Sequence, residues 1–408
     1  MEATFVTQEQ KRGRNQLAAI VVLGHAIKHI YNSGLQSILL PEIKLGLALS
    51  ATQFGTLAFS RQLMGWTTTV AAGYLGDRFA NRAPLMLGIS MTLMGIAYFV
   101  AGSAPDYWTM LGAMLLVGIG PSMYHPPAIG ALSRRFPDKR GFAISLHGTG
   151  GSIGEVLGPL IAASALTILM WRHVLQVSMF PAIMAGFLLW SMMRSVPGEV
   201  PGTASTGAYF RSIAALLKKG PLVVLVLITA LRSMGQSAIV VFLPVYLRED
   251  LEFSAGKVAM YLAMAQFVGI FAQPAMGHFS DRFGRKVVIV PALMVMSILF
   301  FALTFADPGV QLVLTILGLG AFLYSLHTIF IAAAMDIAGG EVQSTVVSLI
   351  YGASFLGTMS PVLAGLIADN YGTNIVFSYG GAVTMVAALA LSRLKLPKTA
   401  TQMADGGG

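Results

Sequence analysis

Long apolar segments separated by short polar turns run along most of the chain. Each apolar segment is at least ~18 residues long, which is enough for a helix to cross a bilayer. The pattern predicts helices near 17–40, 52–76, 83–103, 107–133, 141–168 and 172–194, and a second six near 221–247, 254–279, 286–306, 309–336, 343–368 and 373–394. We therefore expect an all-α membrane protein with twelve transmembrane helices.

Polar segments divide these helices into two groups. Residues 195–220 are rich in Pro, Gly, Ser and Thr, which is typical of a linker. We expect an N-terminal six-helix bundle over 1–194 and a C-terminal six-helix bundle over 221–408, each with a short cytoplasmic tail. The first apolar segment is too long, and too polar in its middle, for a cleaved signal peptide.

Two copies of one charged turn lie 204 residues apart in this 408-residue chain. The first reads Gly-Tyr-Leu-Gly-Asp-Arg-Phe-Ala-Asn-Arg over 73–82, and the second reads Gly-His-Phe-Ser-Asp-Arg-Phe-Gly-Arg-Lys over 277–286. Each copy ends one apolar segment and begins the next. The repeat indicates two related, pseudo-symmetric halves. Further pairs, such as Leu40-Pro41 with Leu243-Pro244, extend it beyond the turns.

The duplicated turn resembles two cytoplasmic loops of the major facilitator superfamily, between its second and third helices and between its eighth and ninth. The first copy departs from the family pattern at Ala80 and Asn81, where the family has Gly and a cation. The resemblance implies the major facilitator fold, in which two six-helix bundles rock around a site near the membrane midplane. It also implies a gating role for the charged pairs of the two turns, which are Asp77, Arg78, Asp281 and Arg282.

A narrower resemblance lies in the helices expected at 107–133 and 141–168. The segment Gly-Ile-Gly-Pro-Ser-Met-Tyr-His-Pro-Pro over 118–127 and the Gly-rich segment over 141–159 are similar to the fosmidomycin-resistance branch of the superfamily. That branch has an acid after His-Pro, where this chain has Pro127, so no role of that acid is carried over. The resemblance implies drug efflux, with antibiotic resistance as its setting and phosphonate as one substrate chemistry.

Composition excludes an ordinary soluble domain. Charged residues make up 11% of the chain and apolar residues 55%, whereas soluble domains contain about 25% charged residues. The chain has no Cys, which excludes disulfides and thiolate sites. No Gly-x-x-x-x-Gly-Lys motif for nucleotide phosphates is present, so we expect an ion gradient to drive the protein.

No arrangement of catalytic groups stands out in the sequence. We find no convergent nucleophile and base, and therefore expect no enzyme activity and no cofactor. The His residues are potential metal ligands, but few carboxylates accompany them, so we expect no metal site.

The net charge of +9 is mostly a topology signal. When the loops are taken in order, about 19 of the 26 Lys and Arg residues fall on one side and about four on the other. The positive-inside rule places the first side in the cytoplasm. We expect a monomer in the inner (cytoplasmic) membrane, in contact with lipid, with both termini cytoplasmic and no nucleic-acid partner.

Ionisable side chains inside apolar segments are candidate functional groups, because each is costly in a membrane unless it faces protein or water. Polar residues on the first helix recur at helical spacing along one face, and the first helix of the second half repeats part of that stripe. The alternative is that they only hydrogen-bond between helices. The expected substrate-binding residues are His25, Lys28, His29, Asn32, Arg61, Gln62, Arg232, Gln236, Gln266, His327 and Tyr351.

Two groups are candidates for proton coupling. Glu155 is the one clear carboxylate expected in the membrane interior, either as a proton carrier or as a fixed counter-ion to Arg61 or Lys28. His125 precedes Pro126-Pro127, which should interrupt its helix because proline lacks an N–H and clashes with the preceding turn. A His beside a broken helix is either a relay or a locally hydrogen-bonded side chain.

The charges expected in the interior favour an anionic substrate. Lys28, Arg61 and Arg232 bring three positive charges against one carboxylate, which leaves about two without an obvious partner. We expect a proton-coupled exporter of a small organic anion, because carboxylate and phosphonate groups match the donors of Arg. An uptake symporter or an anion exchanger for a small carboxylate remains open, as does a transporter-like receptor.

Overall fold

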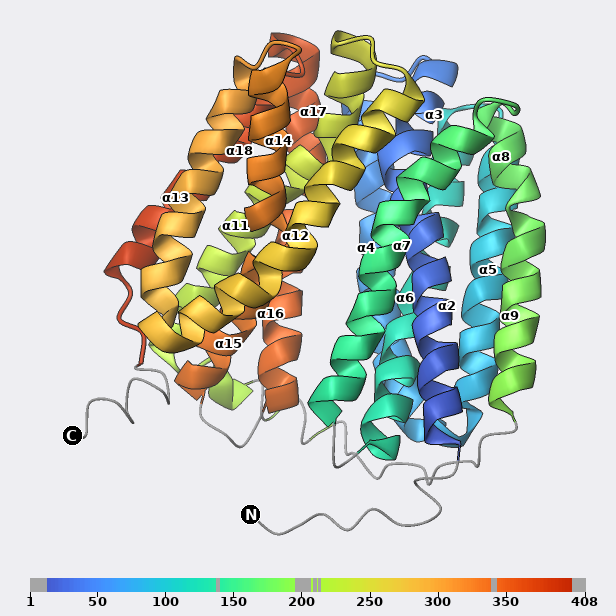
Figure 1. The fold of residues 1–408 in the computed structure, drawn as a ribbon, viewed down its shortest axis with the longest axis horizontal. Helices are drawn as coiled ribbons and strands as arrows, with labels where there is room; N and C mark the ends of the chain where they lie inside the picture. Colours follow the sequence, from blue (N-terminus) through green and yellow to red (C-terminus); the bar gives the residue numbers. More distant parts are fainter. Residues whose placement is uncertain are drawn as a thin grey trace. The chain divides into compact units, whose positions relative to one another are not determined.

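A computed structural model describes residues 13–136, 140–194, 214–338 and 343–397, together with 207 and 211. The described residues are mostly helical and include no strand. The chain divides into two compact units (Figure 1). The first comprises Met1–Leu49 and Ser60–Ala204, and the second comprises Ser50–Phe59 and Ser205–Gly408. Most of the predicted linker lies outside the described residues, so the linker and its bounds stay a prediction.

Six membrane segments occupy the first half of the described chain. The first segment contains a π-helical turn, and the sixth consists of two consecutive helices. In order, the segments are α2 (Arg14–Gly34) with η1 (Leu35–Leu39) and α3 (Leu40–Gly46); α4 (Ala51–Arg78); α5 (Ala83–Ser103), after the short turn η2 (Ala80–Arg82); α6 (Tyr107–Arg135); α7 (Arg140–Ala165); and α8 (Trp171–Val177) with α9 (Met179–Met193).

Six further segments occupy the second half. In order, they are α11 (Gly220–Val245) with η3 (Tyr246–Asp250); α12 (Ala255–Phe283); α13 (Arg285–Thr304); α14 (Val310–Leu323) with α15 (Leu326–Ala338); α16 (Gln343–Gly357) with α17 (Ser360–Tyr371); and α18 (Ile375–Arg393). The prediction of twelve segments is thereby confirmed over the described residues, with helix ends displaced by a few positions.

Prolines do not interrupt α6. The helix runs unbroken from Tyr107 to Arg135, although it contains Pro121, Pro126 and Pro127. The prediction that Pro126 and Pro127 break this helix is therefore wrong. Neighbouring helices can stabilise a proline-containing turn in a membrane protein. Here the fully buried Tyr124 donates a hydrogen bond from its hydroxyl to the carbonyl of Val21 on α2 (2.8 Å).

Side-chain caps begin several helices. Asp106 precedes α6 and accepts hydrogen bonds from the backbone N–H and the hydroxyl of Thr109, each 2.9 Å long. The backbone hydrogen bond lowers the pKa of the Asp106 carboxyl below its usual value. Within the second unit, Asp369 of α17 accepts from the N–H groups of Ala51 (2.7 Å) and Thr52 (2.9 Å). A carboxylate thus caps the start of α4.

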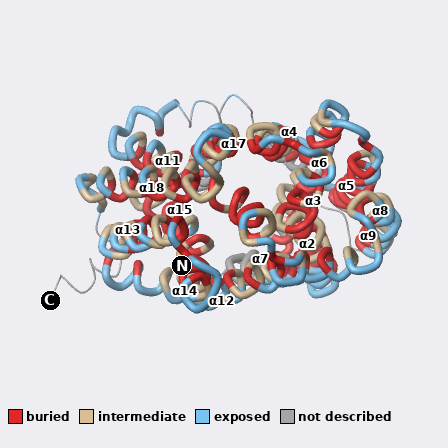
Figure 2. The backbone as a smooth tube through the Cα atoms, turned by 90° about the horizontal axis from the view of Figure 1, so that it is seen from above, coloured by how far each residue is buried: buried red, intermediate tan, exposed pale blue. Residues whose placement is uncertain are grey.

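Glycines bring α2 and α7 into close contact. A Cβ atom at Gly34 would lie 2.8 Å from the carbonyl oxygen of Gly158, and one at Gly151 would lie 2.6 Å from Cε1 of His25. Buried and exposed stretches alternate along the helices in Figure 2, so each helix presents one face to its neighbours. Gly151, Gly154 and Gly158 form the face of α7 that packs against α2, and this contact positions the polar residues of both helices.

Candidate functional site

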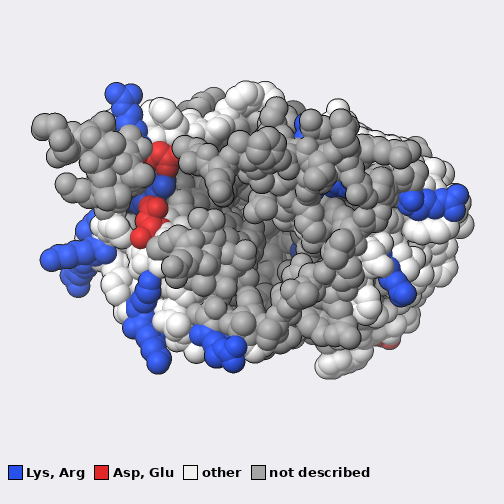
Figure 3. Space-filling view, turned by 90° about the horizontal axis from the view of Figure 1, so that it is seen from below, with Lys and Arg blue, Asp and Glu red and all other residues white. Residues whose placement is uncertain are grey.

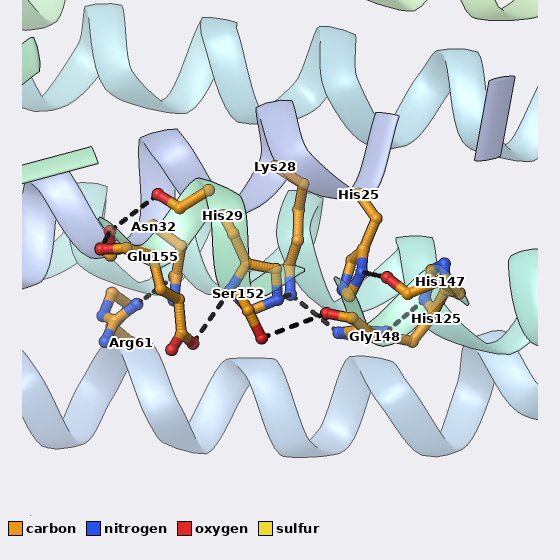
Figure 4. Close-up of polar contacts among 12 residues, drawn as sticks. His25, Lys28, His29, Asn32, Arg61, His125, His147, Gly148, Ser152 and Glu155 are labelled. Carbon is orange, nitrogen blue, oxygen red and sulfur yellow. Dashed lines mark hydrogen bonds and ion pairs between the residues drawn. The ribbon is translucent and has the colours of Figure 1, made fainter. Parts of the chain in front are cut away.

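A polar cluster lies inside the first unit, on α2, α4, α6 and α7 (Figure 4). Four of its members are buried, among them His25, which is 4% exposed, and Lys28, which is 6% exposed. We call this group the first-unit cluster. It consists of His25, Lys28, His29, Asn32, Gln36, Arg61, His125, His147 and Glu155.

Lys28 lies between two histidines. Its Nζ atom is 3.2 Å from Nε2 of His29 and 2.8 Å from Nε2 of His125. An ammonium has only donors, so each imidazole nitrogen accepts. Lys28 is thus held by neutral acceptors, and no carboxylate of the described residues forms an ion pair with it.

Glu155 pairs with His29. Its Oε1 atom is 3.1 Å from Nδ1 of His29, and the two side chains are 32% and 15% exposed, respectively. Glu155 forms no direct ion pair with Arg61 or Lys28 among the described residues, and its predicted alternative role as their counter-ion stays a prediction. Nevertheless His29 contacts Lys28, so Glu155 lies one side chain away from that cation.

Arg61 reaches from α4 to two amides, one on α2 and one on η1. Its Nη1 atom donates to Oδ1 of Asn32 (2.6 Å), and Nη2 donates to Oε1 of Gln36. The Nε–H of Arg61 is buried and has no hydrogen-bond partner among the described residues. The Nε–H donor of Arg61 is therefore not used by any described residue.

Three histidine rings gather at the other end of the cluster. Nδ1 of His25 donates to the carbonyl oxygen of His147 (2.7 Å), and the two rings stack with centroids 3.7 Å apart. Nε2 of His147 is 3.5 Å from Nδ1 of His125. Figure 4 shows these side chains coming from α2, α6 and α7.

The predicted binding and coupling residues do not include His147 and Gln36, although Gln36 belongs to the polar stripe of the first helix and His147 resembles His125 as a weaker candidate. A signal for His147 exists in the chain. Together with Gly151, Gly154 and Gly158 it follows i, i+4, i+7 and i+11 spacing, which places it on the α7 face that meets α2. Gln36 continues the polar stripe of α2.

Among the described residues of the second unit, Arg232 of α11 is the buried cation, and it is 4% exposed. Its Nη2 atom donates to Oε1 of Gln236, whose Nε2 in turn donates to the carbonyl of Leu323 (2.7 Å). Leu323 ends α14, where helix carbonyls lack their usual partners. Arg232 also lies over the ring of Phe330 (5.7 Å to the centroid), and its Nε has no partner among the described residues.

The remaining predicted binding residues are less closely connected. His327 lies edge-on to Tyr351, with ring centroids 4.8 Å apart, and Tyr351 is 56% exposed. Nε2 of His327 is buried without a partner in the described part of the chain. Gln62 and Gln266 are half-buried on α4 and α12, and neither hydrogen-bonds to a described residue of the first-unit cluster or to Arg232.

The second charged turn forms an ion-pair network at the end of α12. Arg285 donates from Nη1 to Asp281 and from Nε to Asp336 of α15 (2.9 Å). Arg282 instead lies over the ring of Phe283. Among the predicted gating residues, Asp77 and Arg78 have side chains outside the described part of the structure. Sequence reasoning did not include Arg285, which joins the two acids.

Basic side chains gather near helix ends that are predicted to be cytoplasmic. Figure 3 shows Lys and Arg spread over the described part of one face, with a small acidic group beside some of them. Described basic residues close to these ends are Arg14, Arg82, Arg194, Lys219, Arg282, Lys286 and Arg393.

Comparisons with known proteins agree with this architecture. The sequence model of the Major Facilitator Superfamily matches residues 26–360 and 225–406. The chain is 25% identical over 404 residues to the uncharacterised MFS-type transporter YfnC of Bacillus subtilis (strain 168), covering 95% of this chain and 96% of that protein. It is 24% identical over 364 residues to the fosmidomycin resistance protein of Escherichia coli (strain K12), covering 86% and 87%. A crystal structure of a mutant of the nucleoside transporter NupG has a TM-score of 0.80 at 14% identity, covering 93% of this chain and 99% of that one.

Proposed function

This chain belongs to the major facilitator superfamily, and we propose that it is a proton-coupled exporter of a small organic anion that works by alternating access. It is a multi-pass membrane transporter and not an enzyme. The likeness to a fosmidomycin resistance protein supports export and an anionic drug-like substrate. Both termini in the cytoplasm, the inner membrane as the location and a monomeric state belong to the same proposal.

The observation that carries the proposal is the set of cations without acidic partners. Lys28 and Arg232 are buried and Arg61 is half-buried, and none forms an ion pair with a carboxylate of the described residues. Removing a charge from water is costly unless an opposite charge replaces the lost hydration. A substrate anion supplies that charge at either arginine.

The free donors of the two arginines define the chemistry of the anion. Nε of Arg61 and Nε of Arg232 are both buried without a partner among the described residues. Hydrogen bonds from a guanidinium to carboxylate or phosphonate oxygens are short and charge-assisted, and a planar donor fork favours planar or tetrahedral oxyanions. We therefore infer a substrate with at least one carboxylate or phosphonate group.

Glu155 supplies the proposed link between proton and substrate. Its carboxylate faces His29, and His29 in turn contacts the ammonium of Lys28. Adding a proton to Glu155 removes the negative charge near this pair and changes the electrostatic field at Lys28. Proton binding and anion binding would thus be coupled through neighbouring side chains of one unit. His125 stays the second candidate for coupling.

Transport into proteoliposomes tests the proposal. Labelled phosphonate and carboxylate compounds are offered to vesicles with and without an imposed pH gradient, and the gradient should raise the accumulated label several-fold. Lys257→Ala is a matched control, because Lys257 is a cation that stacks on Phe253 outside both polar groups. Equal accumulation of label with and without the pH gradient would contradict proton coupling. The sign of the effective gradient separates export from uptake.

A further inference from the structure

Three imidazoles from three helices converge in the first-unit cluster, and two of them are buried while His125 is half-buried. His25 of α2, His125 of α6 and His147 of α7 each offer a nitrogen atom, and these atoms lie within 4.8 Å of one another. His25 is 4% exposed and His147 is 3% exposed. The three rings also pack directly, with centroids 4.7 Å apart for His25 and His125 and 5.7 Å apart for His125 and His147.

The hydrogen bonds of the cluster leave ring nitrogens available. The carbonyl of His147 can only accept, so Nδ1 of His25 carries the proton and Nε2 of His25 presents a lone pair. That Nε2 atom is buried and has no partner among the described residues, and the same holds for Nδ1 of His147. Histidines that serve only to join helices would have these nitrogens hydrogen-bonded, as nearly all buried polar atoms are.

This arrangement has the chemistry of a metal site. A metal-binding His usually donates its other N–H to a carboxylate or a backbone carbonyl, as His25 does toward His147. Neutral imidazoles suit zinc, cobalt, nickel and copper, whereas magnesium and calcium need oxygen ligands. The sequence alone did not indicate such a site, because His125 and His147 are adjacent only in the folded unit.

We propose that His25, His125 and His147 bind one divalent transition-metal ion of the zinc type. His25 contributes Nε2, and the other two histidines contribute one ring nitrogen each. Zinc–nitrogen bonds of about 2.0–2.1 Å place ligand nitrogens roughly 3.3 Å apart in a tetrahedral site. The nitrogens are up to 4.8 Å apart here, so the rings must tilt inward by about 1 Å or more as the ion binds.

Lys28 opposes the metal ion. Its ammonium nitrogen is 2.8 Å from Nε2 of His125 and places a positive charge against the proposed ligand set. Two cations this close repel each other strongly in a protein interior. The site is therefore weakened by a residue that makes no bond to the metal. Removing the ammonium while keeping all three histidines should strengthen metal binding. The same change is expected to weaken the binding of an anion.

Cobalt titration tests the site directly. The chain, purified without a histidine tag and stripped with a chelator, is titrated with Co²⁺ and followed by visible absorption; Zn²⁺ is then added to displace it. We expect one ion per chain with a tetrahedral spectrum. His25→Gln, His125→Gln and His147→Gln should each weaken binding at least ten-fold, and the exposed His173→Gln should bind like the parent. The chain contains no Cys, so no thiolate can bind the probe.

Lys28→Met provides the second test and keeps all three ligands, so it remains informative if a histidine variant fails to fold. We expect at least ten-fold tighter Co²⁺ binding in this variant. Unchanged affinity in Lys28→Met, or binding in the triple histidine variant equal to that of the parent, would overturn the proposal. No substrate or pH gradient is present in these titrations, so their failure leaves the proposed anion transport untouched.

Discussion

The two units hold a buried cation at matching positions but surround it differently. Lys28 and Arg232 are separated by the repeat offset of 204, as are Asn32 and Gln236. In the second unit Arg232 bonds to Gln236 on its own helix. In the first unit the corresponding amide, Asn32, accepts a hydrogen bond from Arg61 of α4. Lys28 contacts two histidines instead.

One difference in sequence accounts for much of this contrast. The residue at the repeat position of Arg61 is Ala265. Without an arginine there, the amide of the second unit is free to bond to the cation one turn away on its own helix. In the first unit, where that arginine is present, Lys28 contacts His29 and His125, and His29 pairs with Glu155. The comparison teaches that one residue can change the hydrogen-bond partners of a cation at a repeated position.

The largest expected effect follows from Glu155, the carboxylate that pairs with His29 in the first unit. We predict that Glu155→Gln abolishes pH-driven transport and leaves exchange of substrate across the membrane intact. The amide of glutamine can neither bind and release a proton nor become negatively charged. Proteoliposome transport with and without a pH gradient measures both. Glu42→Gln, on α3, serves as the control. Full gradient-driven transport in Glu155→Gln would show that Glu155 does not couple protons to transport.

The cations of both units should contribute to affinity. We predict that Arg61→Ala and Arg232→Ala each weaken substrate binding at least ten-fold, which corresponds to ~1.4 kcal/mol. Lys28→Ala should weaken it less, because an ammonium lacks the planar donor fork. Equilibrium binding to purified protein gives the three affinities. A loss of substrate affinity in the variants of only one unit would contradict the proposal that cations of both units bind the anion.

The charged turn of the second unit should affect the rate of transport turnover and not the affinity for substrate. Asp281 and Asp336 share Arg285, so Asp281→Asn loosens this network without reaching either buried cation. We predict a several-fold slower turnover with unchanged substrate affinity, because such contacts form in one access state and break in another. Asp77→Asn should act in the same way in the first unit. Turnover equal to that of the parent would show that these turns play no part in gating.

The smallest effect concerns the supporting amides. Gln236→Met removes the acceptor that Arg232 uses, whereas Asn32→Ala still leaves Arg61 with Gln36. We therefore predict a larger loss of affinity for Gln236→Met than for Asn32→Ala, both within about ten-fold. Titration of the same ligand against both variants compares them. The reverse order would mean that Asn32 contacts the substrate itself.

The helices and the repeat could be predicted from sequence because both depend on local pattern. Apolar length defines a membrane segment, and the two charged turns recur in the same context. Side-chain partners depend on which helix faces meet, which one sequence does not specify. The pairing of Glu155 with His29 and the stacking of His25 on His147 both come from the close approach of α2 and α7.

The positions of proline do not predict where the helices of this chain end. Packing around Tyr124 supports α6 through Pro126 and Pro127, so the break expected there is absent. The corresponding segment of the second half does break, between Leu323 and Leu326, and no proline lies there. That break frees the carbonyl of Leu323 for Gln236, so it helps to position the buried arginine.

The central claim is that buried cations in both units bind an anion, and a matched binding series tests it most directly. A small phosphonate, its neutral ester and an amine of equal size are titrated against the purified parent protein and against the double variant Arg61→Ala/Arg232→Ala. The account predicts that the parent binds the phosphonate at least ten-fold more tightly than the ester or the amine, a difference of ~1.4 kcal/mol or more, and that the double variant loses this preference. Equal affinity for all three ligands, or preference for the amine, would contradict it.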